Sequence, residues 1–192
     1  MDTTKRRETM AGLRALKREA GEEQKKGLPF MLASVVLWGV FLLVQWTCKE
    51  ITIQNLYTFL CSCLLMPLAF LFSKLLKADI FKKTDNPINK LGFLCTMNQM
   101  LYILIAMWAF SKSPENMLMI YAMIFGAHLL PFAWVYDCKP YIAASIVDTL
   151  GALVTAQLWG NRATALFFVI AQAMLCLALL RDLRKGRMTI EG

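Results

Sequence analysis

Charged residues are scarce in this sequence. Of its 192 residues only 18% are charged, whereas 58% are hydrophobic and the mean hydropathy is +0.51. Soluble domains carry about a quarter of their residues as charged side chains. A soluble fold of this length could not bury so much apolar surface, but a lipid bilayer accepts it as an outer face. The composition therefore predicts an integral membrane protein and excludes a soluble globular domain.

Residues that bind metals or catalyse reactions are also few. The chain has one histidine and six cysteines, and the cysteines form no metal-ligand pattern. Cys61 and Cys63 are two residues apart, so on a helix they point about 200° apart. The sequence has no Walker loop, no glycine-rich nucleotide fingerprint and no serine–histidine elbow. We expect no metal and no cofactor, and enzymatic activity stays uncertain, with a non-enzymatic role favoured.

Long uncharged runs are what the sequence has instead. A hydrocarbon core about 30 Å thick is crossed by a helix of about 20 apolar residues. The sequence predicts an all-α polytopic membrane bundle of six transmembrane helices within residues 27–180, preceded by a charged leader (1–26) and followed by a basic tail (181–192). The predicted spans are residues 28–46, 56–76, 91–110, 117–136, 141–159 and 164–180.

The positive charges are distributed unevenly about these spans. Eighteen of the 21 Lys and Arg residues lie in the leader, between Lys74 at the end of the second span and Lys90, at position 139 and in the tail. The other side holds only Lys49, Lys112 and Arg162. Because cytoplasmic segments carry the excess of Lys and Arg, both termini are predicted to be cytoplasmic (N-in/C-in) in a plasma membrane. The net charge of +8 therefore indicates topology, and we expect a lipid bilayer and no nucleic acid as its partner.

The leader allows two interpretations. It can be a solvated, partly disordered tail that serves mainly as an orientation signal. Alternatively, it can be a short in-plane helix on anionic lipid, with Met10, Leu13 and Leu16 on its apolar side. The five acidic residues of the leader argue against the second interpretation.

Polar side chains inside the predicted spans are the candidate functional residues. At a rise of 1.5 Å per residue, one such residue from each of the last four spans lies about 10–12 Å from the cytoplasmic end of its helix. We call the five candidates the predicted polar layer: Asn98, Gln99, His128, Asp148 and Gln172. Three further polar residues share helix faces with them as supporting groups: Tyr102, Tyr121 and Thr155. Asp148 falls on a small and polar helix face, so it is expected to face the bundle interior.

Two prolines predict helix kinks. Pro67 and Pro131 lie near the cytoplasmic ends of the second and fourth spans, within the similar stretches 65–72 and 129–136. A proline inside a helix removes a backbone hydrogen bond and bends the axis. The similarity of the stretches is either the trace of a duplicated hairpin or a coincidence among common membrane residues.

Three segments carry a resemblance to a known family. The stretches NQMLYILIAMW (98–108) and AMIFGAHLLPF (122–132), with the linker NPINKLG (86–92), resemble a family of small bacterial polytopic integral membrane proteins of unknown function. The likeness extends from about Gly27 to Leu180. It implies a bacterial plasma membrane and no particular chemistry.

Two functional hypotheses follow. In the first, the protein is a small permease- or transporter-like bundle, with Asp148 and His128 as a proton- or substrate-responsive centre and Asn98, Gln99 and Gln172 as orienting groups. In the alternative, it is a non-catalytic membrane scaffold or partner protein, and the polar layer is structural. Six helices are few for a transporter monomer, so a homodimer is one expected arrangement. The sequence does not identify a substrate.

Overall fold

The computed structural model describes residues 3–80 and 85–191, and the surroundings of the side chains of residues 7–80 and 85–184. All regular structure within these residues is helical. Lys82 and Lys83, two of the charges behind the predicted orientation, lie outside the described residues. In chain order the elements are α1 (Thr3–Glu23), η1 (Lys25–Gly27), α2 (Leu28–Thr47), α3 (Ile51–Ser62), α4 (Leu65–Leu76), α5 (Pro87–Lys112), η2 (Pro114–Asn116), α6 (Met117–Ala127), α7 (Leu130–Val135) and α8 (Pro140–Glu191).

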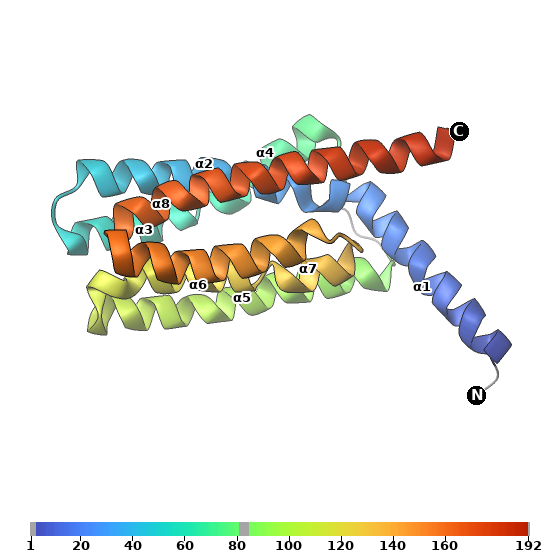
Figure 1. Cartoon of the computed structure of the whole chain (residues 1–192), viewed down its shortest axis with the longest axis horizontal. Coiled ribbons are helices and arrows are strands. Elements are labelled where there is room, and N and C mark those ends of the chain that lie inside the picture. The colour runs from blue at the N-terminus through green and yellow to red at the C-terminus, as the bar shows by residue number, and fades with distance from the viewer. Residues whose placement is uncertain (1–2, 81–84, 192) are drawn as a thin grey trace.

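Helix α8 is a hairpin of two helical arms, residues 140–159 and 161–191. Its backbone leaves helical geometry at Gly160, where φ is 79° and ψ is −175°. This conformation is accessible essentially to glycine alone. Beyond it the chain turns back, so that Thr155 donates a hydrogen bond of 3.2 Å to Thr164 across the turn. One glycine therefore converts a 52-residue helix into two antiparallel rods (Figure 1).

Two further rods are broken near their ends. Helices α3 and α4 are separated by a turn at Cys63 and Leu64, just before Pro67. Helices α6 and α7 are separated in the same way at His128 and Leu129, just before Pro131. Backbone hydrogen bonds span three residues at both turns, with Leu64 N donating to Cys61 O and Leu129 N donating to Gly126 O. The missing proline N–H explains why the regular helical ladder is interrupted at these points.

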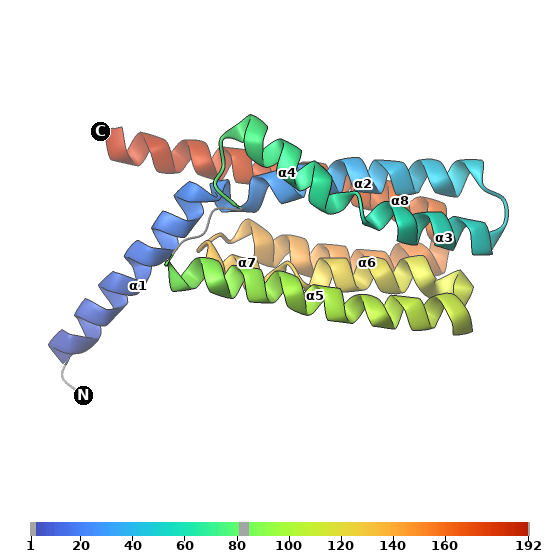
Figure 2. The same cartoon turned by 180° about the vertical axis from the view of Figure 1, so that it is seen from behind.

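The rods alternate in direction, and together they form one bundle (Figures 1 and 2). Helix α8 packs mainly on α2 and α6, whereas α4 packs on α2 and α5 packs on α6. We call the end where α2 begins the terminal end, because both chain termini lie beyond it, and we call the end at Gly160 the hairpin end. Towards the hairpin end the core is aromatic: the Trp38 ring stacks on Phe168 at 4.1 Å and meets Phe125 edge-on.

Five helical stretches are long and apolar enough to cross a membrane: Lys25–Thr47, Ile51–Leu76, Pro87–Lys112, Pro114–Val135 and Pro140–Arg184. The last of them contains both arms of the α8 hairpin, so the five stretches supply six membrane-length rods. The all-α fold expected from the sequence is confirmed for the described residues.

Helix α1 leaves the terminal end of the bundle obliquely (Figure 1). Its C-terminal half is docked on the bundle. Leu13 and Leu16 pack against the core cluster at that end, and Lys17 lies over the Trp134 ring at 3.4 Å. The Asn86 amide, at the start of α5, donates a hydrogen bond of 2.9 Å to the Leu16 carbonyl. The described part of the leader is therefore helical, and its second half belongs to the folded body.

Candidate functional site

Asp148 lies at the centre of a buried hydrogen-bond chain. The Gln172 side-chain amide donates to the Asp148 carboxylate at 2.6 Å, and the Ser34 hydroxyl is 3.2 Å from the other end of that amide, the Gln172 Oε1 atom. Ser34 also lies 2.7 Å from the Met31 carbonyl. Asp148 is 1% exposed, and Gln172 and Ser34 are fully buried. We call this set the Asp148–Gln172–Ser34 chain; it joins both arms of α8 to α2.

Gly126 on α6 determines how closely a third element approaches this chain. A Cβ atom at Gly126 would lie 2.8 Å from both the Asp148 Cβ atom and the Thr149 backbone nitrogen. Real side chains do not tolerate such distances, so only a glycine lets the two backbones meet here. This contact covers Asp148 on the α6 side and contributes to its burial. Sequence reasoning missed Gly126, although it lies in the stretch that carries the family resemblance.

Among the described residues, no hydrogen bond or ion pair joins His128 to the Asp148 carboxylate. It lies in the turn between α6 and α7, where its Nδ1 atom is 2.6 Å from the Phe125 carbonyl oxygen. A carbonyl can only accept, so Nδ1 is the donor of this hydrogen bond. The ring contacts Phe125 and Phe132 edge-on, at 5.3 and 5.7 Å. The ion pairs among the described side chains, Arg18–Glu22 and Lys26–Asp182, include neither His128 nor Asp148.

The remaining candidate residues are dispersed. Asn98 lies on the exposed surface of α5, with the half-buried Gln99 beside it and the exposed Tyr102 one turn away. Tyr121 is buried in the aromatic core, with its ring centroid 6.1 Å from that of Trp38. The Thr155 hydroxyl lies within the α8 hairpin, 2.6 Å from the Gly151 carbonyl and 3.2 Å from the Thr164 hydroxyl. The structure thus joins Asp148 to Gln172, whereas Asn98, Gln99, His128 and Tyr121 form no hydrogen bond to either residue among the described residues.

Further buried polar groups occur towards the hairpin end, and sequence reasoning did not single them out. Gln45, Asn55 and Thr58 are each at most 1% exposed. The Asn55 amide donates to the Pro114 carbonyl at 2.7 Å, and Arg162 donates to the Gln45 carbonyl at 2.9 Å. Each of the three side chains retains one buried polar atom with no hydrogen-bond partner. All three lie at or near the ends of the predicted spans, and only the structure shows that they are buried.

A second polar network closes the terminal end. The Tyr136 hydroxyl donates to the Gln24 side chain at 2.6 Å, and the Tyr141 hydroxyl donates to the Lys26 carbonyl at 2.7 Å. Lys26 forms an ion pair of 2.5 Å with Asp182. These contacts hold the segment between α1 and α2, where Lys25, Lys26 and Gly27 all have positive φ.

Cys138 belongs to the same network. Its thiol donates to Asp182 at 3.6 Å, and the residue is 2% exposed. Burial, followed by the negative charge of Asp182, raises the pKa of the Cys138 thiol to about 12. Reactive cysteines need a thiolate, so this thiol has the properties of a packing residue.

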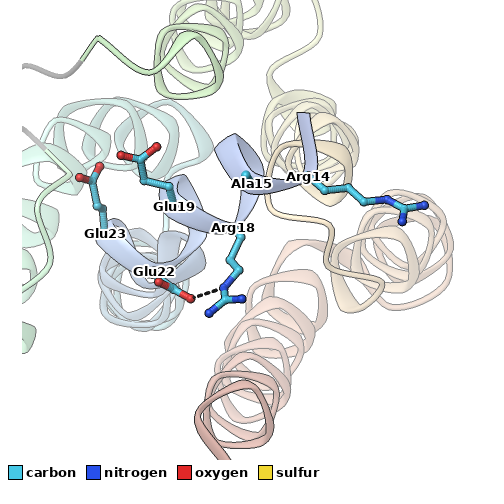
Figure 3. Close-up of a pocket in the computed structure, with 6 residues that line it drawn as sticks. All are labelled: Arg14, Ala15, Arg18, Glu19, Glu22 and Glu23. Carbon is cyan, nitrogen blue, oxygen red and sulfur yellow. Dashed lines mark hydrogen bonds and ion pairs between the residues drawn. The ribbon is translucent and has the colours of Figure 1, made fainter. Parts of the chain in front are cut away.

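The outer surface of α1 carries a shallow hollow (Figure 3). Figure 3 shows the Arg18–Glu22 ion pair on one side of the helix and Glu19 and Glu23 on the other. Those two acids accept hydrogen bonds from Asn86, which caps the start of α5, and from Asn89 in its first turn. They therefore dock α1 on the bundle. Among the described residues, no three His, Cys, Asp or Glu side chains gather to form a metal site.

These features define the class of the protein. Over the residues that the structure describes, it is a helical bundle whose rods are apolar enough for membrane insertion, and it contains a buried hydrogen-bond chain with a carboxylate. The chain belongs to DUF7010, a family of unknown function, whose family model matches residues 13–182. The match includes the docked half of α1, both turns before the prolines and the whole Asp148–Gln172–Ser34 chain. No curated protein and no solved structure matches the chain.

Proposed function

We propose that this protein is a multi-pass protein of a bacterial plasma membrane, with six transmembrane helices and both termini in the cytoplasm. The six membrane-length rods alternate in direction, which brings the leader, the α4–α5 and α7–α8 linkers and the tail to the terminal end. Eighteen of the 21 Lys and Arg residues belong to those segments or flank them. An excess of Lys and Arg marks the cytoplasmic side of a membrane protein.

Single-cysteine labelling tests this orientation. Lys49, at the hairpin end, and Lys90, near the terminal end, are both exposed. Lys49→Cys and Lys90→Cys are made in a background without the native cysteines. A membrane-impermeant maleimide is expected to label the first variant in intact spheroplasts and the second only in inverted vesicles. The reverse pattern would overturn the proposed topology.

Within the membrane, we propose a non-catalytic role as a scaffold or partner protein. The observation that carries this proposal is that the Gln172 amide donates a hydrogen bond to the buried Asp148 carboxylate from within the same hairpin. Because its three side chains are hydrogen-bonded to one another, the Asp148–Gln172–Ser34 chain holds α2 and α8 together. Of the groups that would have to complete a substrate layer, Asn98 is exposed on α5, and His128 is bonded to the Phe125 carbonyl and not to Asp148. The basic surface at the terminal end is then the working face of the protein.

A proton-responsive transporter is the second candidate, and one observation favours it. The buried Asp148 carboxylate has no ion-pair partner among the described residues, and it lies against Gly126, two residues before the turn at His128. A carboxylate without a counter-ion inside a membrane bundle is a common site of proton uptake. The α6–α7 turn beside it could then bend when Asp148 gains a proton.

The substitution Asp148→Asn separates the two roles. Asparagine keeps the shape and can accept the Gln172 hydrogen bond, but it cannot exchange a proton. If the Asp148–Gln172–Ser34 chain is only structural, the Asp148→Asn variant retains its thermal stability and still complements a deletion strain. Replacing the exposed Arg7 and Arg14 by Gln then impairs complementation. If the protein is a transporter, Asp148→Asn folds normally but loses proton flux in reconstituted liposomes. Asp137→Asn, at the terminal end, is the control for charge removal alone.

A further inference from the structure

Helix α5 is one of the two least embedded membrane-length rods of the bundle. Of its most apolar 18 residues only 11% are buried, the same share as in the α3–α4 rod (Ile51–Leu76), compared with 56% for Lys25–Thr47. It packs on α6 and α7 along one stripe that includes Ile88, Gly92 and Ala106, and it lies at the edge of the bundle in both views (Figures 1 and 2). Most of its circumference therefore faces outwards.

One outward stripe of α5 has the spacing of a coiled-coil seam. Its members follow one another at alternating intervals of three and four residues, which keeps them on one side of a helix over several turns. The apolar members are each at least 38% exposed. The stripe, called the Asn98 seam below, consists of Leu91, Leu94, Asn98, Leu101, Ile105 and Trp108.

Asn98 distinguishes this seam from the rest of the outward surface. It is the eleventh residue after Pro87 in a 26-residue helix, about 16 Å from its start and hence near the middle of the proposed membrane span. The side chain is exposed, and among the described residues its amide has no hydrogen-bond partner. At that depth no water satisfies an amide, so a partner in another helix lowers its free energy.

A second outward stripe of α5 provides the internal comparison. Phe93, Met97, Met100, Leu104 and Met107 repeat at the same intervals and are each at least 43% exposed. Helical geometry places the two stripes about a third of a turn to either side of the buried stripe. The second stripe contains no polar side chain. Lipid tails pack against such an apolar surface as favourably as another helix would. The second stripe therefore needs no protein partner.

We propose that the Asn98 seam is the interface of a parallel homodimer of this chain. This inference rests on the membrane insertion proposed above. All copies insert in the same orientation, so a two-fold axis along the membrane normal brings the two α5 helices together in parallel, with Asn98 at the same depth in each. An amide has both donor and acceptor atoms, so the two Asn98 side chains satisfy each other with two reciprocal hydrogen bonds. A second copy therefore supplies the partner that the amide requires.

Counting subunits in liposomes tests the proposal. The full-length protein, carrying a C-terminal fluorescent protein, is reconstituted into phosphatidylethanolamine–phosphatidylglycerol vesicles, and bleaching steps are counted over a range of protein densities. The wild type is expected to show two steps. Asn98→Leu is expected to raise the dimer dissociation constant about tenfold, the loss expected for two interhelical hydrogen bonds. Asn98→Gln should retain the dimer, and Met97→Leu, on the second stripe, should leave the constant unchanged.

Cysteine crosslinking tests the geometry independently. In a parallel two-fold interface each seam residue meets its own copy. Leu94→Cys or Leu101→Cys, in a background without the native cysteines, should therefore form an intermolecular disulfide on mild oxidation, and Leu104→Cys should not. Three results would overturn the proposal. They are a single bleaching step at every protein density, a Met97→Leu variant whose dimer dissociation constant rises as much as that of Asn98→Leu, and crosslinking through Leu104→Cys. Vesicle flotation separates these outcomes from a failure of membrane insertion.

Discussion

The Gln172 side-chain amide donates a hydrogen bond of 2.6 Å to the Asp148 carboxylate, although the two residues are 24 positions apart in α8. In an uninterrupted helix they would be separated by about 36 Å. The bond exists because the hairpin at Gly160 folds one arm back on the other. The same bond supplies a donor to a carboxylate that is almost completely buried.

Replacing Gln172 by Leu is expected to destabilise the bundle strongly. The substitution leaves the Asp148 carboxylate buried without its donor, which costs about 2–3 kcal/mol of unfolding free energy. SDS titration in mixed micelles measures the change. Gln157→Leu, at an exposed position in the first arm of α8, is the matched control and should cost less than about 0.5 kcal/mol. Equal effects of the two substitutions would show that the buried hydrogen bond contributes nothing specific.

A methyl group at Gly126 is expected to separate α6 from α8. The added Cβ atom would lie 2.8 Å from the Thr149 backbone nitrogen, which cannot move away as a flexible side chain would. We expect Gly126→Ala to lower the unfolding free energy by about 1–3 kcal/mol.

Gly39 provides the control for that substitution. It lies inside α2, and a Cβ atom there would meet nothing within 4 Å. Gly39→Ala should therefore stabilise the protein by about 0.5–1 kcal/mol through helix propensity. Equal destabilisation by both substitutions in thermal unfolding would contradict the close approach at Gly126.

Stability at alkaline pH should depend on Cys138. The pKa of its thiol is raised to about 12 in the folded protein, whereas in the unfolded chain it has its ordinary value near 9. Above pH 9 the unfolded chain loses this proton before the folded protein does, so folding stability falls as the pH rises. Cys138→Ala removes this contribution, which is about 1 kcal/mol at pH 10. Comparing unfolding of the variant and the wild type at pH 8 and pH 10 measures it, with Cys48→Ala as the control.

Docking of α1 should depend on the contact between Lys17 and Trp134. The ammonium group lies 3.4 Å from the ring centroid, an arrangement that contributes about 0.5–1 kcal/mol at a partly exposed site. Trp134→Leu keeps an apolar side chain but removes the ring, so α1 should open more often. Faster tryptic cleavage at Arg14, with unchanged thermal stability of the remaining bundle, is the expected result. Unchanged cleavage would show that Leu13 and Leu16 alone hold the helix.

The sequence predicted the helical rods better than their contacts. Uncharged runs of the right length define a rod, and the small and polar face around Asp148 indicated the side that the structure buries. Which side chain meets Asp148 depends on how neighbouring helices are rotated, and that rotation is fixed by packing at positions such as Gly126. Depth along a helix can be read from spacing, but the direction of a side chain cannot. Asn98 and Asp148 were therefore grouped together, although one faces outwards and the other inwards.

The hairpin at Gly160 has a consequence for biogenesis. An aspartate near the centre of a single helix costs about 2.5–3.5 kcal/mol when that helix leaves the translocon for lipid. The arm with Asp148 is followed at once by the arm with Gln172, and the two are hydrogen-bonded to each other across one glycine. We therefore expect the two arms to enter the bilayer as a unit, so that a ribosome-bound chain truncated before Gln172 integrates less efficiently than one that extends beyond Arg184.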